Sequence, residues 1–119
     1  MQKPRSPTPS LYEQIDQRPF SDIVTAINRC RRYRKFLRSD DSHLSDMAFD
    51  AILHNLAVIG EAVRALPDAL TKSRPDIPWT SIAGLRDIVV HEYFRVNPDL
   101  IVDIVDNYLG GLEQALEAH

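Results

Sequence analysis

The segment Gly84–Phe94, with the sequence GLRDIVVHEYF, decides how the rest of the chain is interpreted. Its apolar residues Leu85, Ile88 and Val89 recur at i, i+3 and i+4, which is the spacing of an α-helix with one buried face. The same segment holds an arginine, a histidine and a tyrosine within eight residues. A fixed cation, an imidazole that titrates near neutral pH and a phenol are together enough chemistry for a site that cleaves RNA.

The angles along this predicted helix restrict how its polar side chains meet. At about 100° per residue, Arg86 and Tyr93 project within roughly 20° of each other, whereas His91 lies roughly 140° from Arg86. Either Arg86 reaches around the helix, or the helix loosens near His91, or a second copy of the chain completes the site. We favour the last solution, a symmetric homodimer whose motif helices meet at a twofold axis. Asp87 precedes His91 by four residues and is predicted to orient its imidazole.

Hydrophobic periodicity predicts helices along the remaining chain. The predicted helices cover Ser21–Leu37 with Ser21 as N-cap, Leu44–Leu66, a short turn at Asp68–Lys72, and Pro98–Glu117 with Asn97 as N-cap. No alternating strand pattern of useful length occurs. We therefore predict an all-α fold, a four- to five-helix up-and-down bundle over residues 20–119. The proline-rich residues 1–19 are predicted to form a flexible tail.

Length and composition limit which classes of protein this chain can belong to. The chain has 119 residues and a net charge of −3. It contains no apolar run approaching the ~18 residues of a membrane span, and its start lacks the apolar core of a secretory signal. Its single cysteine, Cys30, falls on an apolar helix face and is predicted to be a small core residue. These features lead us to expect a cytoplasmic protein that does not associate with a membrane.

The charge is unevenly distributed. Residues 1–40 hold nine Lys/Arg and four Asp/Glu, whereas residues 41–119 hold five and thirteen. Within the first predicted helix, Arg31, Arg32 and Lys35 are candidates for binding RNA phosphates. A solvated basic face near a helix C-terminus, or a docking surface for an acidic protein, would explain the same residues.

Several segments together resemble the HepT-like toxins of the HEPN superfamily. Arg86-x4-His91-x-Tyr93 matches their R-x4-H-x-Y signature, and Asn55–Ala62 resembles their N-L-x-x-I-G-E-A run. Ile77–Trp79, with the sequence IPW, also looks like the family, and the resemblance covers roughly residues 20–116. One departure is Asp87, where close relatives usually carry asparagine. The resemblance implies an endoribonuclease that is the toxin of a prokaryotic toxin–antitoxin pair.

The motif residues suit RNA cleavage that needs no metal. His91 is the candidate for proton transfer to and from the ribose and leaving oxygens, and Arg86 for neutralising the scissile phosphate. No cluster with metal-ligand spacing is present in the sequence, so we expect neither a metal nor a cofactor. Tyr93 could position a phosphate, stack on a base, or simply be a packed aromatic side chain.

The family resemblance also implies a partner. HepT-like toxins are paired with a minimal, MntA-like nucleotidyltransferase antitoxin, and the resemblance implies that this partner transfers AMP from ATP to Tyr93. The bulky, negatively charged AMP would exclude RNA from the cleft. Asn55 and Glu61 are candidates for flanking that cleft; alternatively, Asn55 is a buried hydrogen-bonding residue and Gly60 marks a close helix crossing.

Two other functions remain open at this point. The chain would serve as a non-catalytic subunit that binds a nucleotidyltransferase if Asp87 spoils the cleft. It would serve as a structural helical adaptor if its basic helix docks an acidic protein.

Overall fold

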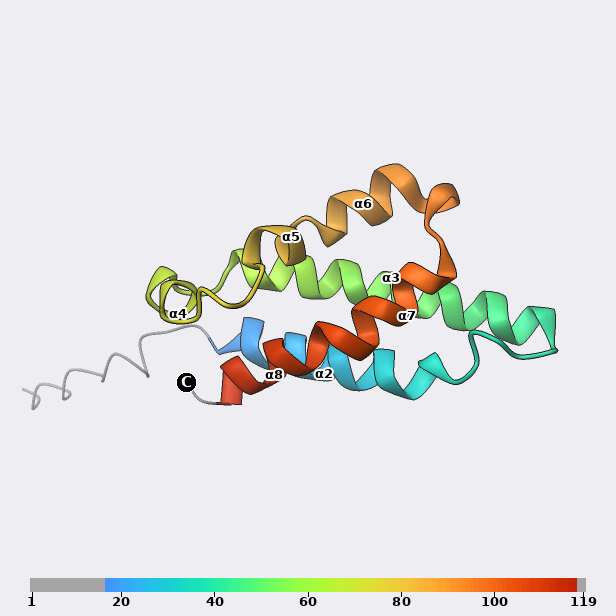
Figure 1. Ribbon diagram of the computed structural model, residues 1–119, viewed down its shortest axis with the longest axis horizontal. Helices are drawn as coiled ribbons and strands as arrows, with labels where there is room; N and C mark the ends of the chain where they lie inside the picture. The colour runs from blue at the N-terminus through green and yellow to red at the C-terminus, as the bar shows by residue number, and fades with distance from the viewer. Residues whose placement is uncertain (1–16, 118–119) are drawn as a thin grey trace, which may run out of the picture.

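The fold is a helical bundle built from four antiparallel rods (Figure 1). The computed structural model describes residues 17–117, and over that range its regular structure contains helices and no strand. The elements are α2 (Arg18–Arg34), α3 (Ser42–Arg64), α4 (Asp68–Ser73), α5 (Trp79–Ala83), α6 (Leu85–Glu92), the 3₁₀-helix η1 (Tyr93–Arg95), α7 (Pro98–Asn107) and α8 (Leu109–Glu117). The rods α2, α3, α5 with α6, and α7 with α8 run alternately up and down. The predicted all-α up-and-down bundle is confirmed, and most of the predicted tail lies outside the described residues.

The helix ends follow local chemistry that the sequence revealed only in part. α2 begins at Arg18 rather than at the predicted Ser21, because Pro19 is tolerated in a first turn, where its missing N–H needs no partner. Ser21 therefore lies inside the helix, and its hydroxyl donates to the Arg18 carbonyl oxygen at 3.2 Å. Asp41 caps α3 with its carboxylate, and Asn97 caps α7 as predicted.

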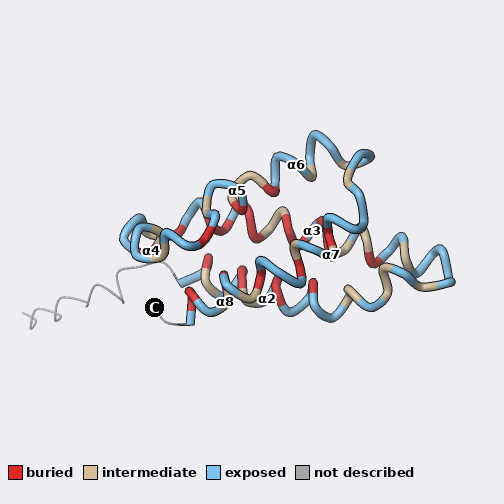
Figure 2. The backbone as a smooth tube through the Cα atoms, viewed as in Figure 1, coloured by how far each residue is buried: buried red, intermediate tan, exposed pale blue. Residues whose placement is uncertain are grey.

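The hydrophobic core surrounds α3, which contacts α2, α5, α6 and α7. Figure 2 shows the buried positions concentrated where α2, α3 and α8 face one another. The largest fully buried side chains come from these three helices: Ile23, Ile27, Cys30, Ile52, Leu53, Leu56, Ile59, Leu109 and Leu112. Burial raises the pKa of the Cys30 thiol to about 12, so this cysteine is a core residue and not a reactive thiolate, as predicted.

Two predictions about the C-terminal half are wrong. The last helix, for which the sequence indicates a bend at Gly110–Gly111, instead breaks at Tyr108. The Tyr108 side chain, which the helical spacing predicts to be buried, is 46% exposed. In the motif helix only Leu85 is buried, whereas Ile88 is 42% exposed. α6 lies at the edge of the bundle and is covered along one side only, so a part of its predicted apolar face stays open (Figure 2).

Trp79 anchors the connector that leads into this edge, as predicted. Its indole N–H donates to the Arg74 carbonyl oxygen at 2.9 Å, and its ring packs on the core. Among residues 17–117, no helix combines the length and the apolar character that crossing a membrane would take.

Candidate active site

The site begins where the α5–α6 rod crosses α3 at Gly60. A Cβ atom at Gly60 would lie 2.9 Å from the Ile82 carbonyl oxygen and 3.0 Å from the Arg86 backbone nitrogen. Real Cβ atoms do not approach backbone atoms so closely, so the crossing requires glycine. The predicted close crossing at Gly60 is confirmed, and it fixes the backbone of Arg86 against α3.

The Arg86 side chain lies over α3 beside Glu61. Its Nε is 3.5 Å from the Glu61 Oε2, and its Nη1 is 3.4 Å from the Asp87 Oδ1. Both distances exceed the 2.7–2.9 Å that is typical of strong charge-assisted hydrogen bonds. Arg86 is half-exposed, so these carboxylates hold it loosely and a phosphate can replace them. The fold therefore brings Glu61 to Arg86, two residues that sequence reasoning had named separately.

Asp87 is bound by a residue that sequence reasoning missed. Its Oδ2 accepts a hydrogen bond from Arg64 Nη2 at 2.9 Å. This guanidinium holds the pKa of the Asp87 carboxyl below its usual range, with smaller contributions from the charges of Arg86 and His91. Within the described part of the chain, no side-chain hydrogen bond joins Asp87 to His91. Arg64 lies four residues after Gly60 on the same face of α3, and that helical spacing is the signal that could have identified it.

His91 lies exposed in the last turn of α6. Over residues 17–117 its side chain makes no hydrogen bond or ion pair, and so has no such contact with Arg86. This separation follows from the angular argument, because a single short helix points the two side chains to different sides. One chain therefore supplies Arg86 and His91 without assembling them.

Tyr93 is held at a different point on α3. α6 ends at Glu92, whose φ of −123° and ψ of 19° are not helical, and Tyr93 starts the 3₁₀ turn. Its hydroxyl donates a hydrogen bond to the Asp50 Oδ1. Glu61 and Asp50 are eleven residues apart on α3, which corresponds to roughly 16 Å of helix axis. The α3 partners of Arg86 and Tyr93 therefore lie about three turns apart.

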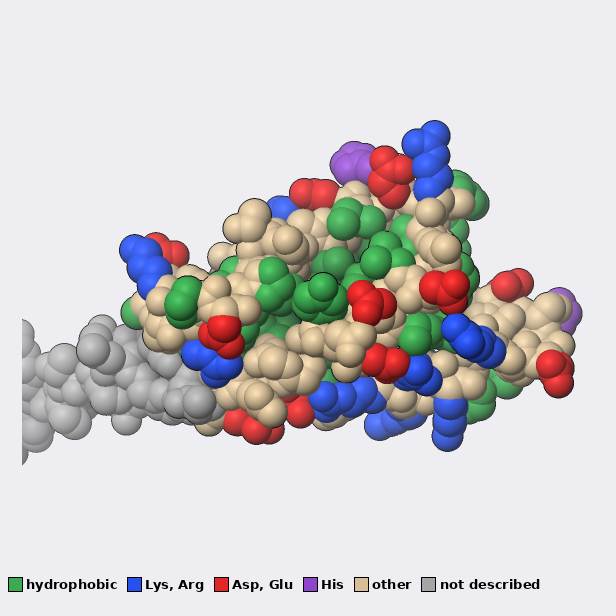
Figure 3. All heavy atoms as spheres, in the orientation of Figure 1, with side chains coloured by type: hydrophobic (Ala, Val, Ile, Leu, Met, Phe, Trp, Pro, Cys, Tyr) green, Lys and Arg blue, Asp and Glu red, His purple; other side chains and the backbone are tan. Residues whose placement is uncertain are grey.

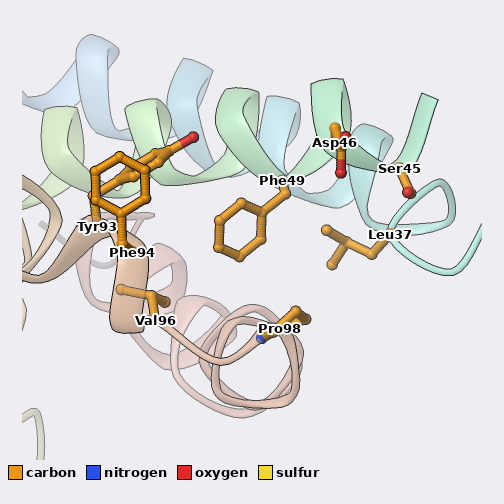
Figure 4. A pocket seen from close by; sticks show the side chains of 8 residues that line it. All are labelled: Leu37, Ser45, Asp46, Phe49, Tyr93, Phe94, Val96 and Pro98. Carbon is orange, nitrogen blue, oxygen red and sulfur yellow. The ribbon is translucent and has the colours of Figure 1, made fainter. Parts of the chain in front are cut away.

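Aromatic edges fix the Tyr93 ring (Figure 4). Its centroid is 6.3 Å from that of Phe49 and 4.9 Å from that of Phe94, both in edge-to-face arrangements. The ring lines an open cavity of about 340 Å³, which is also lined by Leu37, Ser45, Asp46, Phe49, Phe94, Val96 and Pro98. Sequence reasoning gave no indication of this cavity, because its walls come from four separate segments.

The electrostatic surroundings of Tyr93 are acidic. The hydrogen bond to Asp50 raises the pKa of the Tyr93 phenol, and desolvation and the charges of Asp50 and Asp46 raise it further. The phenol is therefore protonated at neutral pH. Two carboxylates also make this a poor place for an RNA phosphate, so within one chain the geometry does not favour Tyr93 as a phosphate ligand.

Asn55 lies away from both Arg86 and Tyr93. It is 4% exposed, and its Nδ2 donates to the Ala51 carbonyl oxygen at 2.7 Å. It borders the groove between α2 and α3, next to Asp22 and Arg29. The plainer account of Asn55 as a buried hydrogen-bonding residue is confirmed, and one chain does not place it beside Arg86.

The basic helix α2 is partly neutralised by the chain itself. Arg31 donates two hydrogen bonds to the Glu113 carboxylate, at 3.0 and 2.9 Å, and Arg34 and Arg38 pair with Asp106 and Asp99. Arg32 and Lys35 stay exposed, and the Lys35 Nζ lies 5.1 Å from the centre of the Phe36 ring. The acidic partner of this helix is thus, in large part, the α7–α8 rod.

Among the described residues 17–117, no group of three or more His, Cys, Asp or Glu side chains is arranged to hold a metal ion.

Comparison with known proteins places these features in a family. The family model described as "Ribonuclease HepT-like" matches residues 23–119, which include Gly60, Glu61 and the whole motif segment. No solved structure matches the chain significantly.

Relatives of this chain carry related names. MJ0127, a candidate RNase of Methanocaldococcus jannaschii, is 41% identical over 73 residues, which are 53% of this chain and 60% of that protein. MJ1216 of the same organism, also a candidate RNase, is 43% identical over 87 residues, or 73% of this chain and 64% of that protein. A probable ribonuclease HepT of Thermococcus cleftensis is 27% identical over 96 residues, which are 81% of this chain and 87% of that protein. The chain thus spans less than two thirds of the length of the first two.

Proposed function

Because the chain belongs to the ribonuclease HepT-like family, we propose that it is a metal-independent endoribonuclease, the toxin of a prokaryotic toxin–antitoxin pair. Arg86 and His91 are its catalytic residues. Tyr93 is the residue at which a minimal nucleotidyltransferase antitoxin attaches AMP and so silences the toxin.

One observation carries this proposal. The two segments that resemble the family, 55–62 and 86–93, meet in space, because Gly60 admits the backbone of Arg86 and Glu61 pairs with its side chain. Two segments that are interlocked in this way form one functional unit. The exposed guanidinium of Arg86 can bind two phosphate oxygens, and the exposed imidazole of His91 is a group that can accept or donate a proton.

A homodimer is the assembly that would complete the site. Because one chain separates Arg86 from His91, a second copy would supply the missing side chain to each of two equivalent clefts. Exposed apolar side chains support this assembly, and three of them, Ile88, Leu100 and Tyr108, line one open cavity between α6 and α7. Figure 3 shows hydrophobic side chains spread across the face between these two helices. A patch of this kind on a small domain indicates an interface.

Silencing by AMP follows from size and charge. A phosphodiester on Tyr93 would place a negative charge and a bulky nucleoside at the end of α6. In the dimer that group would stand at the cleft and repel an RNA phosphate from the arginine. Silencing therefore requires no contact between Tyr93 and Arg86 of the same chain.

The test is RNA cleavage by the purified, unmodified protein in the presence of EDTA. Wild type is expected to cleave, and Arg86→Ala and His91→Ala are each expected to lose about 10²–10⁴-fold in rate. His54→Ala is the matched control, since His54 is an exposed histidine on α3 that borders the α2–α3 groove. Cleavage that survives both motif substitutions would contradict the assigned roles.

A second function is favoured by one observation, the pairing of Arg86 with Glu61 and Asp87 and its separation from His91. In that case the chain is a non-catalytic subunit that binds a nucleotidyltransferase. Absence of cleavage by dimeric protein, with intact mass showing unmodified Tyr93, would favour this function over the ribonuclease.

A further inference from the structure

We propose that Asp50 is the catalytic proton acceptor when AMP is transferred to Tyr93. This inference rests on the proposed function, because it concerns the reaction that silences the toxin. It adds a residue of the toxin itself to a reaction otherwise assigned to the nucleotidyltransferase. The carboxylate comes from the N-terminal half of α3 and touches the phenol oxygen that attacks the nucleotide.

The Tyr93 side chain is held in an orientation that suits a nucleophile. Phe49 and Phe94 hold its ring by their edges, so the hydroxyl is directed at the Asp50 carboxylate. Asp50 itself is exposed and, over the described residues, its carboxylate has no hydrogen-bond partner other than Tyr93. A carboxylate that is not neutralised by a nearby arginine keeps its capacity to accept a proton.

An open cavity borders the ring of Tyr93 and leaves room there for an incoming nucleotide. The ring of Tyr93 forms one wall of the cavity of about 340 Å³, whose other walls include Phe49 and Phe94 (Figure 4). A cavity of that size is within the range of small-molecule sites, and its opening to solvent lets the ATP-loaded partner approach.

The reaction can be written with every atom placed. The Tyr93 Oη attacks the α-phosphorus of ATP, and the new Oη–P bond forms as the bond from that phosphorus to the α–β bridging oxygen breaks. Pyrophosphate leaves with the electron pair, and the phenolic proton passes to the Asp50 Oδ1. Asp50 also raises the pKa of the phenol, so free phenolate is scarce at neutral pH and a base in contact is required.

Asp46 is the matched control residue for this role. It lies four residues before Asp50 on α3 and lines the same cavity. Its charge acts on Tyr93, but only Asp50 receives the phenolic hydrogen bond. Substitution of Asp46 therefore changes the local charge without removing the base.

The experiment measures the initial rate of AMP incorporation by intact mass. Full-length protein is mixed with a purified MntA-like nucleotidyltransferase and Mg²⁺-ATP. Asp50→Asn keeps an oxygen that accepts the phenolic hydrogen bond but loses basicity, so its rate is expected to fall about 10²–10⁴-fold, while Asp46→Asn changes the rate only a few-fold. Sodium formate, a small carboxylate, is expected to restore much of the rate of Asp50→Ala. Thermal unfolding establishes that each variant is folded.

The outcomes separate this inference from the proposed function. Wild-type rates in Asp50→Asn, or a slow Asp50→Ala that formate does not rescue, would overturn the role of Asp50 and leave silencing by AMP intact. Wild-type protein that takes up no AMP would overturn both.

Discussion

The two ends of α3 hold the two halves of the motif in different ways. Near Arg64, α3 meets Arg86 through a backbone crossing at Gly60 and a long, solvent-exposed ion pair with Glu61. Near Phe49, α3 meets Tyr93 through aromatic edges and one hydrogen bond to a carboxylate. The backbone of Arg86 is thus fixed while its guanidinium can exchange its partners. The phenol of Tyr93, in contrast, is itself held in place.

This difference separates two kinds of chemistry within one short segment. A cation whose carboxylate partners are weakly held can exchange them for a phosphate. A phenol held against a carboxylate cannot bind a phosphate easily, but it can lose its proton to that carboxylate and act as a nucleophile. We infer that the Arg86 end serves RNA cleavage and the Tyr93 end serves modification.

The largest effect is expected from Gly60→Ala, which disturbs the Arg86 end alone. Its Cβ would meet two backbone atoms at 2.9 and 3.0 Å, so the crossing must widen at a cost of about 1–3 kcal/mol. RNA cleavage is expected to fall with stability because the Arg86 backbone moves, whereas AMP uptake at Tyr93 stays near the wild-type rate. Chemical denaturation and the two activity assays check this.

Gly111→Ala is the matched control for that substitution. A Cβ there has no atom within 4 Å, and the position is exposed in α8. The variant is expected to be more stable by about 0.5–1 kcal/mol, as is usual for alanine in a helix. Equal destabilisation by both substitutions would show that the crossing does not depend on close packing at Gly60.

Phe49→Leu disturbs the Tyr93 end alone. Loss of the edge-to-face contact is expected to cost about 0.5–1.5 kcal/mol beyond the lost burial and to let the phenol move. AMP uptake should slow several-fold while RNA cleavage by the unmodified protein persists. A parallel loss of both activities would show that the two ends are not independent.

The basic face of α2 provides a third, weaker effect on RNA binding. Arg32→Gln with Lys35→Gln removes two exposed cations, whereas Arg31→Gln removes one that is already paired with Glu113. The slope of log K for RNA binding against log salt concentration measures the number of phosphate contacts. In the double variant we expect this slope to become shallower by about 0.7 for each phosphate contact that is lost, and in Arg31→Gln to change less. Fluorescence anisotropy over a salt series measures this, and equal slopes in all proteins would remove α2 from the RNA footprint.

The smallest effect is expected from Asp87→Asn. Arg64 lowers the folded-state pKa of Asp87 below its usual 3.8, so this pair stabilises the protein above that pH and ceases to do so as the pH falls through the folded-state pKa. The variant should therefore unfold at a slightly lower temperature than wild type near neutral pH, and the difference should vanish as the pH falls through the folded-state pKa of Asp87. A difference that persists in acid would mean that Asp87 stabilises α6 by other means.

Most of the fold followed from the sequence because its helices have strong periodicity and clear caps. The buried stripes of α2 and α3, the capping role of Asn97 and the crossing at Gly60 are all consequences of local spacing. The exposure of Ile88 and Tyr108 did not follow, because periodicity marks an apolar face without showing whether another element covers it.

The motif named candidate residues for the site but did not reveal their contacts. A motif names Arg86, His91 and Tyr93, yet the partners of two of them come from α3, 43 residues away for Asp50 and 25 for Glu61. The end of α6 at Glu92 also changed the direction of Tyr93, so an ideal helix placed Arg86 and Tyr93 closer than they are. Tertiary packing, which no local pattern records, decides both features.

The most direct test measures RNA cleavage and AMP uptake on the same two variants, Arg86→Ala and Tyr93→Phe. The separation of roles predicts that Arg86→Ala accepts AMP but does not cleave RNA, and that Tyr93→Phe cleaves RNA but accepts no AMP. Loss of the same activity in both variants would contradict the division of the motif between the two ends of α3.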